Sequence, residues 1–170
     1  MKRMATPLMA LCLSLSLMLE PNSAKALDAP NGQIILTISG NISNRNTATG
    51  ASFDAPMLKA LGMNLIETTT PWHDGAVRFE GPLISDIMAT VGASGETVMV
   101  TATDGYSVEV PYADFEQFKP ILAILRNGEE MPDADQGPLF IIYNYDGDPQ
   151  LNTDEFHARS VWSVRSMEVE

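Results

Sequence analysis

Residues 97–110 read TVMVTATDGYSVEV and place two segments rich in β-branched residues on either side of an Asp-Gly pair. The flanking segments, 97–103 and 106–110, have the length of strands. The pair Asp104-Gly105 tolerates the positive φ angles that a tight hairpin turn requires. This stretch therefore predicts a β-hairpin, and with it a sheet-rich fold.

Apolar segments of strand length recur on both sides of the hairpin. We expect further strands over residues 33–40, 64–70, 77–79, 121–125, 139–143 and 161–166. Short helices are expected over 54–62, capped by Ser52 or Asp54 and ended by Gly62, over 83–92, ended by Gly92, and over 111–118. The polar stretches 41–50, 71–75 and 144–155 are expected to be loops. The pattern predicts one mixed α+β, sheet-rich domain.

Residues 1–26 have the features of a secretory signal. Two basic residues precede an apolar run that is too short to span a bilayer, and Ala24-Lys25-Ala26 is a small-x-small cleavage site. We expect cleavage after Ala26, a periplasmic or secreted location, and no membrane insertion afterwards. Residues 27–170 would then form the mature domain.

Cleavage would make an acidic chain more acidic. The 170 residues have a formal net charge of −12, and residues 27–170 hold seven basic and 21 acidic residues, which is a net charge of −14. Such a charge repels phosphate backbones and anionic membranes, so nucleic acid is not an expected partner. The single cysteine, Cys12, lies in the signal, which leaves no cysteine after residue 26.

The metal-ligating residues are few. Without cysteine after residue 26, a Cys-rich zinc or iron–sulfur site is excluded from the domain. His73 and His157 lie 84 residues apart, and neither has a histidine partner at helical spacing. We expect both to be surface or loop residues, and we predict no metal site and no catalytic residue.

Residues 144–155, NYDGDPQLNTDE, resemble a calcium-binding EF-hand loop in the spacing of their oxygen side chains. However, the sixth position, which must be glycine, is Pro149, and a strand rather than a helix is expected before the loop. We interpret the segment as a solvated acidic loop.

Two polar segments are candidates for a ligand site. Trp72-His73-Asp74 places an aromatic ring, an imidazole and a carboxylate in one expected loop between strands, where they could converge on a small molecule. The alternative is that Trp72 covers the core edge and Asp74 belongs to a turn. For Arg126-Asn127 a turn is favoured, and the alternative is an exposed arginine for an anionic ligand.

Five segments, in their order along the chain, resemble the oxidoreductase molybdopterin-binding domain, which has the sulfite-oxidase-like fold. They are 79–87 (FEGPLISDI), 103–111 (TDGYSVEVP), 122–129 (LAILRNGE), 136–142 (QGPLFII) and 158–162 (ARSVW). Tyr106, in the second segment, joins the candidate ligand-binding residues Trp72, His73, Asp74, Arg126 and Asn127. The resemblance implies a mixed α+β fold that holds a molybdenum–pterin cofactor in catalytic members.

The resemblance also implies a cysteine ligand to molybdenum in the loop after strand 64–70, and here residues 70–75 read TPWHDG. No oxygen or nitrogen ligand replaces a soft thiolate. The family's basic pterin contacts are also replaced, by Gln136-Gly137, Pro138-Leu139-Phe140 and Val161-Trp162.

We therefore expect a cofactor-free, exported ligand-binding or sensory accessory, whose partner is a small-molecule ligand or an exported or membrane sensor protein. The alternative is a periplasmic molybdopterin-dependent oxidoreductase, with His73 or Asp74 toward the metal.

Overall fold

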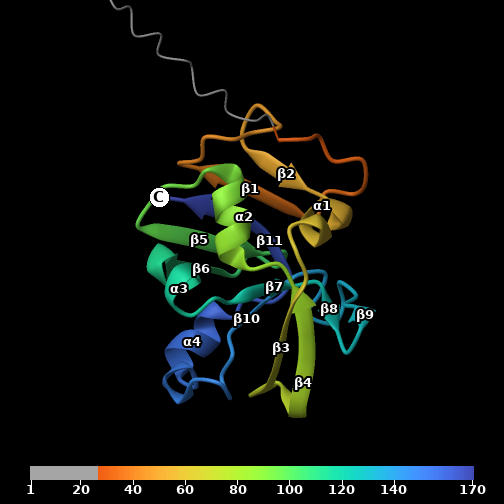
Figure 1. Cartoon of the computed structure of the whole chain (residues 1–170), viewed down its shortest axis with the longest axis vertical. Helices are drawn as coiled ribbons and strands as arrows, with labels where there is room; N and C mark the ends of the chain where they lie inside the picture. The colour runs from red at the N-terminus through yellow and green to blue at the C-terminus, as the bar shows by residue number, and fades with distance from the viewer. Residues whose placement is uncertain (1–26) are drawn as a thin grey trace, which may run out of the picture.

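A computed structural model describes residues 27–170, and the predicted signal, residues 1–26, lies outside the described residues. The described chain is mixed α+β and rich in sheet, as the sequence predicts (Figure 1). A five-stranded sheet has the order β2 (Ala51–Phe53), β1 (Leu36–Gly40), β11 (Val164–Val169), β5 (Thr97–Ala102), β6 (Ser107–Pro111). A four-stranded sheet has the order β3 (Asn64–Thr70), β4 (His73–Gly81), β8 (Leu125–Arg126), β9 (Glu129–Glu130). β10 (Phe140–Ile142) and β7 (Ile121–Ala123) form a two-stranded sheet.

Within residues 27–170, four short helices and one 3-10 turn complete the fold. They are α1 (Ala55–Ala60), α2 (Ile84–Val91), α3 (Tyr112–Gln117), the 3-10 turn η1 (Pro149–Leu151) and α4 (Asp154–Arg159). The buried face of α2 belongs to the same hydrophobic cluster as the inner face of the five-stranded sheet. Figure 1 shows α2 lying across this sheet, while the β3–β4 hairpin extends away from it.

The hairpin expected from residues 97–110 is confirmed. β5 pairs with β6 in antiparallel register, with Val98 opposite Val110 and Val100 opposite Val108. Gly105 has a φ of 92°, so the Asp-Gly pair supplies the left-handed residue that the turn needs. Every second residue of β5 is buried, which places one face of the hairpin on the main core.

A second, smaller core lies between the four-stranded and two-stranded sheets. It contains Ile66, Val77, Phe79, Ile121, Ala123, Met131, Phe140 and Ile142. Trp72 packs against its edge. The β3–β4 hairpin is therefore held by its own core, and its turn lies beside the C-terminal part of the chain.

The prediction that residues 71–75 form a loop is wrong in part. Only Pro71 and Trp72 form the turn, and His73 and Asp74 begin strand β4. The register shifts between Thr69 and Thr70, and Gly75 has a φ of 74°. A β-bulge in β4 thus accommodates Asp74-Gly75, a pair that usually indicates a turn.

Further differences concern short elements and element bounds. Strand β2 was not expected, α4 lies partly inside the expected loop 144–155, and the expected strand 121–125 is divided into β7 and the start of β8. The last strand begins at Val164 rather than at residue 161, because Ser163 has a φ of 51° and interrupts the extended chain.

Asp54 anchors the N-terminal segment to the start of α1. Its Oδ1 accepts a hydrogen bond from the Met57 amide at 2.9 Å, and its Oδ2 accepts from the Asn31 and Gly32 amides, each at 2.8 Å. The expected N-cap is confirmed, and the side chain is nearly fully buried. The hydrogen bonds from Met57 and Gly32 lower the pKa of Asp54.

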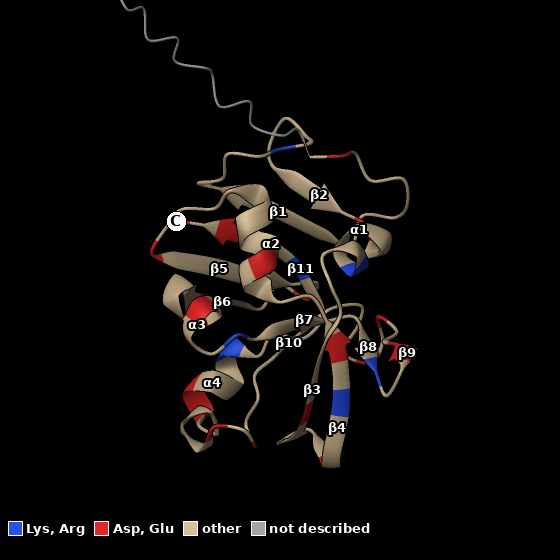
Figure 2. Ribbon diagram, viewed as in Figure 1, with Lys and Arg blue, Asp and Glu red and all other residues tan. Residues whose placement is uncertain are grey.

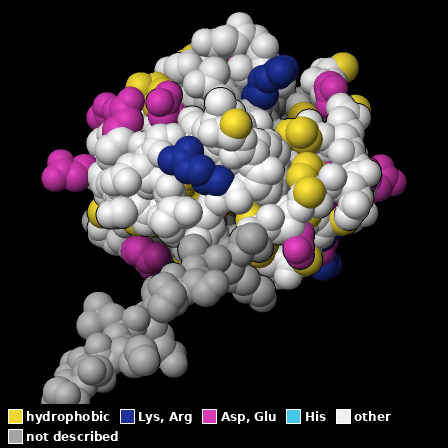
Figure 3. Space-filling model, turned by 90° about the horizontal axis from the view of Figure 1, so that it is seen from above, with side chains coloured by type: hydrophobic (Ala, Val, Ile, Leu, Met, Phe, Trp, Pro, Cys, Tyr) yellow, Lys and Arg dark blue, Asp and Glu magenta, His cyan; other side chains and the backbone are white. Residues whose placement is uncertain are grey.

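Acidic residues are spread over several elements, including α2, α3 and α4 (Figure 2). On the face seen in Figure 3, acidic side chains are scattered and hydrophobic side chains form only small groups. None of the helices between residues 27 and 170 has the length and apolar character needed to cross a membrane.

We predict that Asp54→Asn lowers the melting temperature at neutral pH, because the amide cannot reproduce the three hydrogen bonds to a carboxylate. The folded pKa of Asp54 lies below its unfolded value of 3.8, so its stabilisation is present above that value and is lost as the pH falls through the folded pKa. The difference between parent and variant in thermal melts should therefore shrink below about pH 4. Glu109→Gln, an exposed change of the same charge on β6, is the control. A difference independent of pH would contradict this role.

Candidate functional site

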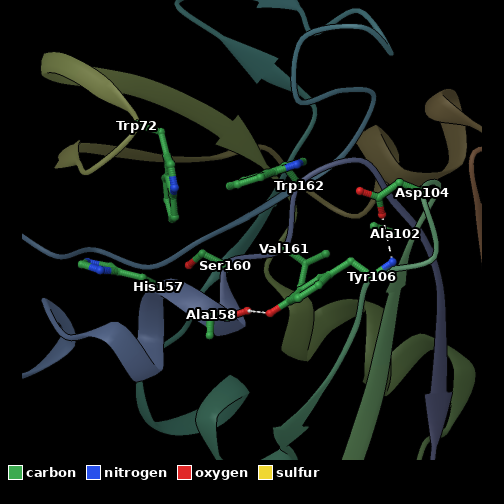
Figure 4. A pocket seen from close by; sticks show the side chains of 9 residues that line it. All are labelled: Trp72, Ala102, Asp104, Tyr106, His157, Ala158, Ser160, Val161 and Trp162. Atoms are coloured by element: carbon green, nitrogen blue, oxygen red, sulfur yellow. Dashed lines mark hydrogen bonds between the residues drawn. The ribbon is translucent and has the colours of Figure 1, made fainter.

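A cleft of about 360 Å³ opens where the β3–β4 turn, the β5–β6 turn and the segment after α4 meet (Figure 4). Its lining residues are Trp72, Ala102, Asp104, Tyr106, His157, Ala158, Ser160, Val161 and Trp162. Both tryptophans of the chain are among them. In Figure 4, Trp72 and His157 lie on one side, Asp104 and Tyr106 on the other, and Trp162 between them.

Trp72 is the centre of an aromatic cluster. Its ring centroid lies 5.5 Å from those of Phe140 and Trp162 and 5.8 Å from that of His157. The interplanar angles are 55° to Phe140, 81° to Trp162 and 71° to His157, so the rings meet at their edges rather than in stacks. The β3–β4 turn is thereby packed against the C-terminal part of the chain.

Backbone pairing with β10 positions Trp162. The Ile141 amide donates to the Val161 carbonyl at 2.9 Å, and the Val164 amide donates to the Leu139 carbonyl at 3.0 Å. Trp162 itself forms an isolated bridge with Phe140. Trp162 as a whole residue is 39% exposed, and it lines the open cleft.

Tyr106 forms the wall opposite Trp72. The carboxylate of Asp104 accepts a hydrogen bond from the Tyr106 amide at 2.9 Å and shapes the turn. The Tyr106 hydroxyl donates to the Ala158 carbonyl at 3.2 Å, which joins the β5–β6 turn to the last turn of α4. Tyr106 as a whole residue is 48% exposed, and it lines the open cleft.

His157 closes the side of the cleft near Trp72. Its Nε2 lies 3.0 Å from Asn152 Oδ1, which can only accept, so Nε2 carries the hydrogen. Tyr145 packs against the imidazole with ring centroids 5.2 Å apart, and burial raises the pKa of Tyr145 to about 12. Since Ser160 Oγ donates to the Phe156 carbonyl, the Tyr145 phenol donates to Ser160 Oγ.

A partly buried ion pair holds α4 and the segment after it. Arg159 Nη1 donates to Asp114 Oδ2 at 2.9 Å, and the Tyr143 hydroxyl donates to the same oxygen at 3.3 Å. Arg159 also pairs with Glu155. Burial raises the pKa of Asp114, and the Arg159 guanidinium opposes that shift. Arg159 thus fixes residues 158–162 to α3.

His73 and Arg126 come together in a separate polar cluster beside the cleft. Arg126 Nη1 donates to His73 Nε2 at 3.2 Å and to Gln136 Oε1 at 3.0 Å, and Arg126 forms an ion pair with Asp135. Because Nε2 accepts, His73 Nδ1 carries the hydrogen and donates to Thr70 Oγ1 at 2.8 Å. Burial and the Arg126 charge lower the pKa of His73, so its imidazole is neutral at pH 7.

The polar cluster supports the turn that carries Trp72. Thr70 Oγ1 also accepts a hydrogen bond from the Trp72 amide at 3.3 Å. Arg126, His73 and Thr70 thus form a chain of hydrogen bonds that ends at the backbone of Trp72. We assign this cluster a positioning role for the aromatic wall.

The structure separates the six predicted ligand-binding residues. Trp72 and Tyr106 share the cleft, His73 and Arg126 share the polar cluster, and Asp74 is exposed in the bulge of β4. Asn127 has a φ of 54° and forms the β8–β9 turn with Gly128, as the favoured interpretation of this segment holds. Its Oδ1 accepts from the Arg78 amide at 3.2 Å.

Seven of the nine lining residues were not among the ligand candidates predicted from the sequence, and they include Asp104, His157 and Trp162. His157 was expected to be a surface or loop residue, but it lies on α4 and lines the cleft. Trp162 appears in the last of the five segments, yet its approach to Trp72 is a contact between residues 90 positions apart. No local pattern reveals such a contact.

The acidic loop has a structural function at the edge strand β3. Asp146 Oδ2 accepts from the Thr69 amide at 2.6 Å, and its Oδ1 accepts from the Thr69 hydroxyl at 2.6 Å. These hydrogen bonds lower the pKa of Asp146 and cover the free edge of the sheet. A strand, β10, precedes the loop, as expected. Within residues 27–170, no group of three or more His, Cys, Asp or Glu side chains is placed to hold a metal ion.

We predict that Arg126→Gln raises the pKa of His73 toward the ordinary histidine value of 6.5, because the variant lacks the adjacent positive charge. In the parent, the unfolded chain takes up a proton on His73 more readily than the folded chain, so stability falls as the pH drops below about 6.5. The measurement is an NMR titration of the imidazole protons.

Arg165→Gln removes the same charge from an exposed position on β11 and should leave the midpoint of His73 unchanged. An equal shift in both variants would contradict a local role for Arg126.

Comparison of the sequence with protein-family models gives no match, and comparison with curated proteins finds no relative. The function proposed below therefore rests on the cleft and on the resemblance of the five segments.

Proposed function

We propose that the protein binds a small molecule in the aromatic cleft and acts outside the cytoplasm as a cofactor-free ligand-binding or sensory accessory. The observation that carries this proposal is the convergence of Trp72, Tyr106, His157 and Trp162 on one open space of about 360 Å³. This volume lies at the lower end of the range of small-molecule sites, about 300–1,000 Å³.

The composition of the cleft supports ligand binding. Aromatic and small apolar groups form most of its wall, and a few polar groups lie among them, as is typical of small-molecule sites. The large side chains are held by packing and hydrogen bonds before any ligand arrives. Such preorganisation reduces the entropy cost of binding.

The resemblance to the sulfite-oxidase-like fold supports the same location. Tyr106 belongs to the second of the five segments and Trp162 to the fifth, and Trp72 lies in the shortened loop where the family has its cysteine ligand. These three side chains, distant in sequence, line one cleft. We propose that the family's cofactor region has become a ligand site in this chain.

The residues near that loop do not suit a molybdenum–pterin cofactor. Residues 27–170 contain no thiolate, and both imidazole nitrogens of His73 are engaged by Thr70 and Arg126. Arg126, the nearest cation to His73, is paired with Asp135 and so is not free to bind a phosphate. These contacts favour a cofactor-free protein over the oxidoreductase alternative.

Export and signalling remain part of the proposal. The features of residues 1–26 support a periplasmic or secreted location, where an exported or membrane sensor protein would be accessible as a partner. We propose that this sensor protein would recognise the ligand-bound form of the domain.

We predict that screening a small-molecule library by thermal shift will find compounds that raise the melting temperature of the parent and also change its tryptophan emission. Both tryptophans line the cleft, so the emission reports on this site alone. Protein purified from its natural exported form should contain no stoichiometric molybdenum by elemental analysis.

Tyr106→Ala removes one exposed wall of the cleft and should weaken the same compounds about tenfold while leaving the circular dichroism unchanged. Tyr112→Phe, which alters a tyrosine outside the cleft, should bind as the parent does. Stoichiometric molybdenum, or ligands that bind the Tyr106→Ala variant as tightly as the parent, would overturn the proposed function.

A further inference from the structure

The charge that lines the cleft is negative only. Among the described residues that line it, Asp104 is the only carboxylate, and neither lysine nor arginine is present. The carboxylate lies at the β5–β6 turn, on the same side as Tyr106 and facing the opening between that ring and Trp162 (Figure 4). An anionic ligand would meet repulsion here, whereas a cation would meet attraction.

We infer that the ligand of this cleft is a small organic cation with a methylated or quaternary ammonium head group. This inference rests on the proposed function and names the chemical class that the cleft selects. The ammonium group would lie among the rings of Trp72, Trp162 and Tyr106, with Asp104 as its counter-ion.

The aromatic rings suit a cation because the face of an aromatic ring carries negative electrostatic potential. Tryptophan attracts cations most strongly, and tyrosine follows. Trp72 and Trp162 meet at 81°, so the contact between them covers the face of only one ring with the edge of the other. Trp162 also meets Phe140 at 88°, and as whole residues Trp162 and Tyr106 are 39% and 48% exposed on the walls of the open cleft.

Asp104 is available as the counter-ion. One of its oxygens, Oδ1, accepts the hydrogen bond from the Tyr106 amide, and this bond directs the carboxylate. Its other oxygen, Oδ2, has no hydrogen-bond donor among residues 27–170. An ammonium head group beside it would gain a charge interaction in addition to its contacts with the rings.

The charge of the whole domain favours the same ligand class. Residues 27–170 have a net charge of −14, and such a field raises the local concentration of cations and repels anions. The two arginines that support the walls of the cleft are already paired, since Arg159 contacts Asp114 and Arg126 contacts Asp135. Their charges are balanced locally and do not reverse the field at the opening.

The test compares ligands of equal shape and different charge. Choline and tetramethylammonium are titrated into the purified protein and followed by tryptophan emission, beside 3,3-dimethylbutan-1-ol, the neutral carbon analogue of choline. Sodium chloride at the same concentration controls for ionic strength. We expect a saturable change with at least one of the two cations and affinity about tenfold weaker for the neutral analogue.

Two variants that each remove one negative charge distinguish the local effect of Asp104 from the effect of the net charge of the domain. Asp104→Asn should weaken binding of the cation about tenfold, and Glu109→Gln, an exposed change on the same hairpin outside the cleft, should leave it within about twofold of the parent. Circular dichroism confirms that both variants are folded.

Different results would contradict the cation inference, the proposed ligand-binding function, or both. If the neutral analogue binds as tightly as choline, or if the two variants lose affinity equally, the inference of a cation site is wrong. If the cations do not bind but other compounds from the library do, the cation inference fails and the proposed ligand-binding function stands. If no compound of either experiment changes the emission, both fail.

Discussion

The packing of Trp72 against Phe140, Trp162 and His157 is the interaction on which the site depends. Trp72 lies at the turn of a hairpin that belongs to the smaller core, whereas Trp162 and His157 lie in the C-terminal part of the chain. Each such aromatic pair contributes about 0.5–1.5 kcal/mol beyond the area it buries. The cleft exists because these rings meet at their edges and leave open space beside them.

The polar groups around the cleft serve this arrangement. Arg126 and His73 fix the backbone of Trp72 from one side, and the ion pair of Arg159 with Asp114 fixes residues 158–162 from the other. The charges of these arginines are balanced within the protein. Asp104 is different, because it lines the open cleft and, among residues 27–170, forms no ion pair with a lysine or an arginine.

The fold was predictable where its determinants are local. Asp104-Gly105 gives the central hairpin, and Gly92, with a φ of 60°, ends α2 as expected. The sequence signals failed where tertiary structure overrides them. A bulge draws His73 and Asp74 into a strand, and α4 is a short helix that buries a single residue, Phe156, so it has no visible apolar stripe. The site was only partly predictable, because its walls come from three segments that meet through long-range packing.

The most direct test of the ligand site is an NMR titration of ¹⁵N-labelled protein with choline, observing the two indole N–H resonances. The account predicts that both indole resonances shift in a saturable way, together with the backbone amides of residues 104–106 and 158–162, while the amides of β1 and β2 do not move. Shifts distributed over acidic residues on all faces, or indole resonances that stay unchanged at saturating choline, would contradict it.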